Sequence, residues 1–371
     1  MTELEALVAL NQLPKIGPVR IRNLMAFFGS AKEVLNASAA QVEEVQQCNK
    51  QISEVLTNWQ KLSDTQRELR ECERNGVQIV TPSSTEWPKG LREYKDAPVL
   101  LYVWGTLNEY EDHSPVAVIG SRKTTNYGRL VTQQLSRQLA HSGHTIISGL
   151  ALGIDTVAHQ AALDSGQRTI AVLGSGLAAV YPRQNRELAE RISQQGAVVS
   201  EYSLFTNPDK QTFPQRNRIV AAWADATVVT EMPERSGAMI TAQFAREMGR
   251  PIFAVPGPID RPSSAGCNLL IQQGAGLITD ARQVSEALHV STEQMDLFQE
   301  TNDAELKANM DHSGLDSVEK ALIETLTSHE QSIEEIHGIT GIDLEEMSVA
   351  LFNLELTGMI KQHPEGTYII S

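Results

Sequence analysis

Short apolar runs alternate with amphipathic stretches through the middle of the chain. The stretches, such as residues 127–141, repeat apolar positions with the spacing of an α-helix. Continuous apolar strands separated by helices are typical of βαβ units and a parallel sheet. The pattern therefore predicts an α/β fold with a Rossmann-like parallel sheet as its core. The predicted strands cover residues 116–120, 145–149, 169–174, 197–200, 226–230, 251–255 and 276–279.

Residues 1–75 show a different pattern, that of short helices in an N-terminal helical domain. The segment from Leu13 to Val19 places a glycine-containing turn between two of them, which is typical of a helix-hairpin-helix. The backbone amides of such a hairpin can hold a DNA phosphate, but many hairpins of this kind are packing units. Packing is the favoured interpretation, because Gly17 is the single glycine of the turn.

The predicted core spans residues 76–289 with its lead-in, and a polar linker without periodicity follows over residues 290–316. Residues 317–371 then predict three helices and a hairpin, which is the winged-helix pattern. In DNA-binding versions the third helix enters the major groove. Here that helix begins near Asp343, Glu345 and Glu346, whose charge opposes phosphate. We therefore expect this module to contact protein rather than DNA.

Charge is distributed unevenly along the 371 residues. The net charge is −15, yet residues 115–280 carry 15 Lys and Arg against 12 Asp and Glu, and 13 of those cations are arginine. Residues 281–371 carry 4 basic against 18 acidic residues. Arginine suits two-point phosphate contacts and stacking on bases. A phosphate-bearing partner is therefore expected on the middle segment and not on the C-terminal part.

The sequence predicts a cytoplasmic protein. No apolar run approaches the roughly 20 residues of a membrane span, and no basic segment precedes the first apolar residues as in a secretory signal. Cys48, Cys72 and Cys267 are widely separated, so neither a disulfide framework nor a zinc knuckle is expected.

Ligands of open parallel sheets bind beyond the carboxyl ends of the strands. Small residues follow several predicted strands and allow backbone amides to converge on an anion. Cations lie beside them, which suits a ligand with several phosphates in a row, and ordinary surface salt bridges are the alternative. The predicted site comprises Gly120, Ser121, Arg122, Lys123, Gly149, Gly174, Ser175, Gly176, Arg183, Arg186, Arg216, Asn217, Arg218, Ser236 and Gly237.

Catalytic chemistry has little support in the sequence. Asp155 and His159 share a helix face and Ser148 is near them, but no nucleophile-elbow signature accompanies the three. Capping and packing roles are favoured for them. The Gly174–Gly176 segment follows the third strand instead of the first, so it is a weak dinucleotide fingerprint. We predict no catalytic residue, no cofactor and no metal.

Ordered blocks of residues between about 80 and 290 resemble the DNA-processing protein A family (DprA, also called Smf). The resemblance implies a single-stranded DNA-binding protein that loads the RecA recombinase during natural transformation, without catalysis. It also implies a homodimer formed through the Rossmann-like domain. The blocks include residues 118–122, 148–155, 171–177, 213–219, 235–242, 254–257 and 266–271.

The same resemblance assigns DNA contacts by motif. Arg122 and Arg183 would be DNA-contacting cations, and Arg216 and Arg218 match the arginine pair of the family. Thr241, in the block that begins at residue 235, completes the predicted site.

Few aromatic residues lie at the strand ends. Tyr127, Tyr181 and Phe213 are the candidates for stacking on bases. Binding is therefore expected to depend on phosphate charge more than on stacking, with strong salt sensitivity and little sequence preference.

Three further hypotheses stay open. Gln294, Leu297 and Phe298 resemble the peptide by which bacterial proteins dock on the replicative sliding clamp, although packing of the Leu-Phe pair on the Rossmann-like domain is favoured. Nucleotide phosphoribohydrolases have related sheets with a catalytic Glu at the same edge, but residues 231–237 lack their paired glycines. This enzyme is the main alternative to a single-stranded DNA-binding protein. The remaining one is a protein adaptor that contacts DNA only incidentally.

Overall fold

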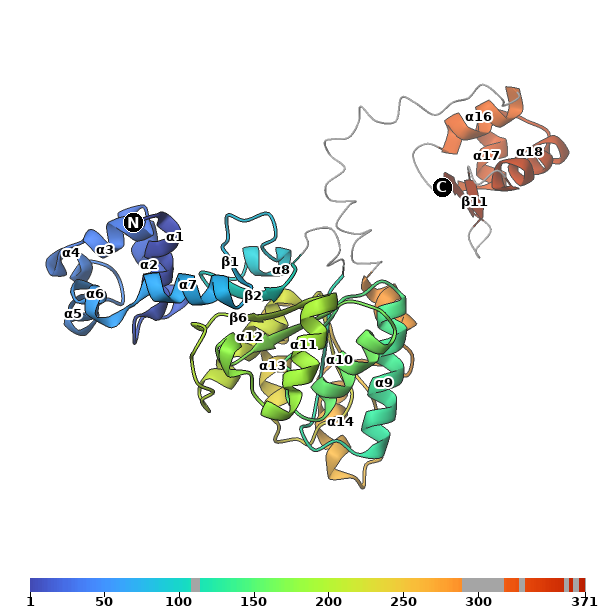
Figure 1. The fold of residues 1–371 in the computed structure, drawn as a ribbon. Coiled ribbons are helices and arrows are strands. Elements are labelled where there is room, and N and C mark those ends of the chain that lie inside the picture. Colours follow the sequence, from blue (N-terminus) through green and yellow to red (C-terminus); the bar gives the residue numbers. More distant parts are fainter. Residues whose placement is uncertain (108–113, 289–316, 327–330, 357–359, 363–366, 371) are drawn as a thin grey trace. The chain divides into compact units, whose positions relative to one another are not determined.

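The computed structural model describes residues 1–107, 114–288, 317–326, 331–356, 360–362 and 367–370 (Figure 1). The chain forms two compact units, Met1–Glu293 and Gln294–Ser371. Within the described part of the chain, no helix is long and apolar enough to cross a membrane.

A nine-stranded sheet with the order β1-β2-β6-β5-β4-β3-β7-β8-β9 forms the centre of the first unit. The seven strands from β6 to β9 are mutually parallel, which confirms the predicted Rossmann-like core. Two antiparallel strands that were not predicted, β1 and β2, extend the sheet beyond β6. The strands are β1 (Val77–Val80), β2 (Leu101–Gly105), β3 (Val116–Ile119), β4 (Ile146–Ser148), β5 (Thr169–Leu173), β6 (Ala197–Ser200), β7 (Ala226–Val229), β8 (Ile252–Ala254) and β9 (Gly276–Leu277).

Helices cover both faces of this sheet. Successive side chains of a strand point to opposite sides, and in strands such as β3 the side chains on both sides are apolar and buried. Val116 and Val118 of β3 share a core with α9 and α10, whereas Ala117 and Ile119 share one with α12, α13 and α14. These helices and their neighbours are α8 (Lys89–Arg92), α9 (Asn126–His141), α10 (Ile154–Asp164), α11 (Arg186–Gln195), α12 (Thr212–Trp223), α13 (Gly237–Glu247) and α14 (Pro262–Gln272), followed by helical residues 282–288.

The N-terminal helices share a hydrophobic core with the β6 side of the sheet. Leu10 and Leu24 belong to the same buried cluster as Leu188 of α11 and Leu204 after β6. The glycine-containing turn joins α1 to α2 as expected. The helices are α1 (Glu3–Gln12), α2 (Pro18–Phe28), α3 (Ala31–Asn36), α4 (Ala39–Glu43), α5 (Lys50–Thr57), α6 (Trp59–Leu62) and α7 (Thr65–Arg74).

The second unit has the predicted winged-helix pattern. Three helices surround a buried cluster that includes Leu322, Met347 and Leu354. A three-stranded sheet has the order β10-β12-β11. Asp343 and Glu346 are exposed at the start of the third helix. The elements are α16 (Ser317–Leu326), β10 (Gln331–Ser332), α17 (Ile333–Thr340), α18 (Leu344–Leu356), β11 (Ile360–Gln362) and β12 (Thr367–Ile370).

Candidate nucleic-acid interface

The loops that the sequence singled out gather along one edge of the sheet. Strands β5, β4, β3 and β7 are adjacent and parallel, so their carboxyl ends meet at the same edge. The chain moves outward from β3 to β6 and then returns to β7 on the other side of β3. Ligands of open α/β sheets bind at such a reversal of strand order. This edge is therefore the candidate site.

The loop after β3 presents two cations and is held in place by a buried carboxylate. Arg122 and Lys123 are exposed. The Glu231 carboxylate, which is buried, accepts hydrogen bonds from the Thr124 hydroxyl and from both the amide and the hydroxyl of Thr125. These bonds fix the segment that follows the cations. They also engage the Glu231 carboxylate in structural hydrogen bonds. Glu231 therefore gives no support to the catalytic glutamate that the phosphoribohydrolase alternative would place in residues 231–237.

Four backbone amides of the loops that were expected to bind an anion donate instead to acceptors within the protein. The Gly149 and Ala151 amides donate to the carboxylate of Asp155. The Ser121 amide donates to the Glu231 carbonyl, and the Gly176 amide donates to the carbonyl of residue 206. These four donors already have partners within the protein. We therefore do not expect these four amides to contact a phosphate.

Arg216 is buried under this edge instead of lining it. Its guanidinium donates to the carbonyls of Gly149 and Val172, and to the side chain of Asn217. Burial lowers the pKa of Arg216 to about 10, and the nearby Asp155 charge opposes this shift. The residue is 4% exposed, so the structure corrects its assignment as a DNA contact. Arg216 supports the ends of β4 and β5 from within.

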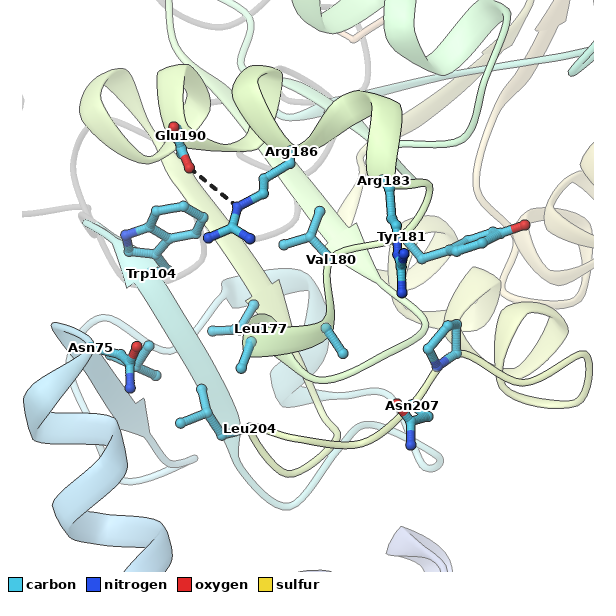
Figure 2. A pocket seen from close by; sticks show the side chains of 14 residues that line it. Asn75, Trp104, Leu177, Val180, Tyr181, Arg183, Arg186, Glu190, Leu204 and Asn207 are labelled. Atoms are coloured by element: carbon cyan, nitrogen blue, oxygen red, sulfur yellow. Dashed lines mark hydrogen bonds and ion pairs between the residues drawn. The ribbon is translucent and has the colours of Figure 1, made fainter.

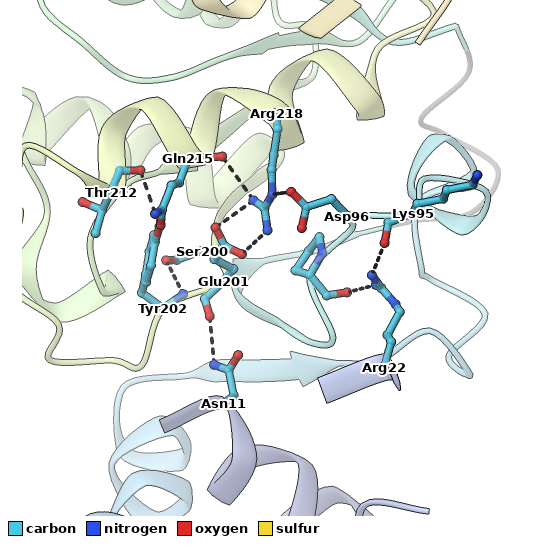
Figure 3. Close-up of polar contacts among 11 residues, drawn as sticks. Asn11, Arg22, Lys95, Asp96, Ser200, Glu201, Tyr202, Thr212, Gln215 and Arg218 are labelled. Atoms are coloured by element: carbon cyan, nitrogen blue, oxygen red, sulfur yellow. Dashed lines mark hydrogen bonds and ion pairs between the residues drawn. The ribbon is translucent and has the colours of Figure 1, made fainter. Parts of the chain in front are cut away.

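Arg218, the second member of the predicted pair, is also a structural residue (Figure 3). It is 5% exposed and forms ion pairs with Glu201 at 2.7 Å and with Asp96 at 2.9 Å. It also donates to the Gln215 carbonyl. Its guanidinium is therefore not available to DNA. The Glu201 carbonyl in turn accepts a hydrogen bond from Asn11, so this cluster connects to the N-terminal helices.

The other predicted residues differ in their access to solvent. Ser236 caps α13 by accepting a hydrogen bond from the amide of residue 238, and the exposed Gly237 accepts one from Asn217. Thr241 is buried in α13, and Ser175 is buried with its hydroxyl on the carbonyl of residue 179, so neither reaches a ligand. Residues 294, 297 and 298, the predicted clamp peptide, lie outside the described residues.

Two neighbouring aromatic rings lie at this edge with an arginine on either side, and we call the four residues the Arg-aromatic strip: Arg122, Phe213, Tyr181 and Arg183. The Arg122 guanidinium lies 5.6 Å from the centroid of the Phe213 ring. The ring centroids of Phe213 and Tyr181 are 5.5 Å apart. Tyr181 is 45% exposed, and Arg183 is exposed two residues further along. Gly174 makes the close approach of Phe213 possible, because a Cβ there would lie 2.8 Å from its ring.

The residues considered for catalysis have structural partners. Ser148 donates to the carbonyl of Val118, and the Nδ1 atom of His159 contacts the Thr169 hydroxyl at 2.7 Å. Burial lowers the pKa of His159 to about 3, so the ring is neutral. In the described ranges, no three His, Cys, Asp or Glu side chains are grouped to hold a metal ion.

Fold and site together define a Rossmann-like protein with a basic and aromatic surface at its strand ends. A sequence model of the family described as DNA recombination-mediator protein A matches residues 78–289, and one described as the DprA winged helix domain matches residues 307–366. The chain belongs to the DNA recombination-mediator protein A (DprA/Smf) family.

Individual relatives agree with this assignment. Protein Smf of Synechocystis is 31% identical over 97% of both chains. The X-ray structure of DNA processing protein A from Streptococcus pneumoniae superposes with a TM-score of 0.66 at 33% identity, and covers 77% of this chain and 98% of its own. The structure of DNA processing protein A from Helicobacter pylori was reported for its single-stranded DNA binding mode. It superposes with a TM-score of 0.52 at 32% identity, and covers 58% of this chain and 97% of its own.

Proposed function

We propose that this chain binds single-stranded DNA along the Arg-aromatic strip. The observation that carries the proposal is the pair of neighbouring aromatic rings in the strip with an exposed arginine on either side. Guanidinium groups attract the phosphates of a strand, and aromatic faces stack on its bases irrespective of sequence. In a duplex the bases are paired and stacked on one another, so these rings favour a single strand. The reported binding mode of the Helicobacter pylori relative supports this ligand.

We further propose that the protein acts without catalysis, in the cytoplasm, as a mediator that loads the RecA recombinase on the bound strand during natural transformation. The description of the family as a DNA recombination mediator supports this role. A homodimer formed through the Rossmann-like domain is part of the same proposal. RecA-catalysed ATP hydrolysis on DNA precoated with a single-strand-binding protein should begin sooner when this protein is present. An unchanged lag would contradict RecA loading.

Fluorescence anisotropy of labelled oligonucleotides tests the DNA-binding step. Equal-length single-stranded and duplex probes should be titrated with the full chain at a low and a moderate salt concentration. We expect tighter binding of the single strand and a steep loss of affinity with salt, because bound phosphates release counterions. Equal affinity for both probes, or no binding at low salt, would contradict the proposal.

A further inference from the structure

A cavity of about 660 Å³ lies next to the Arg-aromatic strip (Figure 2). It is bounded by β1, β2, α11 and the segment that follows β5, and Asn75, directly after α7, lies at its margin. Its apolar wall is formed by the half-buried indole of Trp104 together with Leu177, Val180 and Leu204. We call this cavity the Trp104 pocket. Its volume is in the range of small-molecule sites, which is about 300–1,000 Å³.

The rim of the Trp104 pocket is polar and positively charged. Arg183 and Arg186 lie on it, as do the side chains of Asn75 and Asn207. Arg186 points from α11 toward Trp104 in Figure 2 and contacts Glu190 at 3.4 Å. The Arg186 side chain is 75% exposed, and an exposed ion pair of this kind contributes little free energy. A phosphate can therefore replace Glu190 as the partner of Arg186 at a small cost in free energy.

This lining matches one chemical class, a nucleobase joined to phosphate. A base has two flat apolar faces, which an indole ring and aliphatic side chains can cover. Its polar edge needs donors and acceptors, and an asparagine side chain offers both. The phosphate beside it needs a cation, which Arg183 or Arg186 provides.

The occupant follows from the continuity between the pocket and the strip. Tyr181 and Arg183 line the Trp104 pocket and also form the end of the Arg-aromatic strip. A strand that leaves the strip past Tyr181 meets this cavity next. We propose that the Trp104 pocket takes a nucleobase of the same bound single strand and extends the DNA site toward β2. This inference rests on the proposed function.

Tryptophan fluorescence of the full chain tests the Trp104 pocket. The chain has four tryptophans, of which Trp87 and Trp223 are buried. Stacking on a base quenches indole emission, so oligothymidylate should quench the parent protein. Trp104→Phe should remove most of this quenching, because phenylalanine can still stack on the base but has no indole emission. The matched control Trp59→Phe, on the helix α6, should keep the quenching.

A second measurement compares oligothymidylate with an equally long abasic strand. Trp104→Ala should weaken binding of oligothymidylate about fivefold or more, and should change binding of the abasic strand much less. Equal losses on both strands would mean that Trp104 only supports the surrounding structure. If Trp104→Ala binds both strands as tightly as the parent and quenching is retained in Trp104→Phe, DNA does not enter the pocket. Both outcomes overturn the inference.

Three further outcomes separate the inference from its alternatives. If thymidine monophosphate quenches Trp104 at lower concentrations than oligothymidylate does, the pocket belongs to a free nucleotide, and the assignment to a strand is wrong. If the parent protein does not bind oligothymidylate at all, the proposed function itself fails. If binding depends on Arg122 and Arg183 but not on Trp104, the inference about the pocket alone fails.

Discussion

Arg122 and Arg183 carry the exposed positive charge of the Arg-aromatic strip. Replacing either with alanine should weaken single-stranded DNA binding about tenfold at low salt, as expected for loss of a charge-assisted hydrogen bond. Each change should also lower the slope of log affinity against log salt by about 0.7, because one fewer counterion is released. Anisotropy titrations at several salt concentrations measure both quantities.

A matched control for these variants is Arg137→Ala. Arg137 is exposed on α9, about three helical turns beyond the loop that carries Arg122. It should leave affinity and salt slope within error of the parent. Equal effects of Arg137 and Arg122 would mean that net charge, and not the strip, determines binding.

The buried His159 makes stability depend on pH. Its pKa is about 3 in the folded protein because of burial and the nearby Arg216, and about 6.5 in an unfolded chain. Between these values the unfolded chain binds more protons, so stability falls as pH decreases from about 6.5, by up to about 1.4 kcal/mol per pH unit. His159→Gln should remove this contribution to the slope, which urea unfolding at pH 6.5 and 4.5 measures.

Another buried group, Asp155, changes stability with pH in the opposite direction. The pH dependence of His159→Gln must therefore be compared with that of the parent. Burial raises the pKa of Asp155, and a raised carboxyl pKa favours the folded state at low pH. The parent slope is therefore a sum, and the difference between parent and His159→Gln isolates the histidine. The exposed His141→Gln is the matched control. A parent and a His159→Gln protein with the same slope would contradict the prediction.

At the scale of elements, the parallel strands were predictable and the two antiparallel ones were not. Strands β3 to β8 are buried runs of apolar residues, and such runs are visible in the sequence. Strand β1 is interrupted by the exposed Gln78, so it is not a continuous apolar run and has no comparable signal. Strand β2 lies in the lead-in to the predicted core, and its place beside β6 depends on pairing between distant segments.

The candidate site was also predictable only in part: its exposed cations were, and the contacts between distant segments were not. Arg122 and Arg183 are exposed at strand ends, as their positions along the sequence suggested. Arg218 is buried because its partners come from elsewhere in the chain, Glu201 from 17 residues away and Asp96 from 122. The Trp104 pocket combines residues of β1, β2, α11 and the segment after β5. No local sequence pattern predicts such contacts between segments far apart in the chain.

The Arg218 cluster joins α12 to the end of β6 and to the segment before β2. Glu201 is buried, whereas the Asp96 side chain is 41% exposed. Glu201→Gln should therefore lower the free energy of unfolding by about 3–5 kcal/mol, since it leaves a buried guanidinium without its main partner. Asp96→Asn is the matched comparison and should cost about 1 kcal/mol or less. Urea unfolding measures both, and similar losses would contradict the assigned difference in burial.

At the scale of the whole molecule, charge is segregated between the two compact units. The unit Gln294–Ser371 carries 16 acidic against 3 basic residues, while the Arg-aromatic strip lies in Met1–Glu293. An acidic segment tethered to a DNA-binding unit repels phosphate and lowers its local concentration, whether or not the two units touch. The acidic unit should therefore weaken DNA binding by the intact chain.

A truncated protein that ends at Glu293 tests this effect. It should bind single-stranded DNA more tightly than the full chain at low salt, and the two should converge at about 1 M salt, where the screening length falls to about 3 Å. A difference that persists at high salt would point to direct contact with the site and not to long-range repulsion. Equal affinities at low salt would exclude the repulsion and leave the acidic unit for contacts with protein.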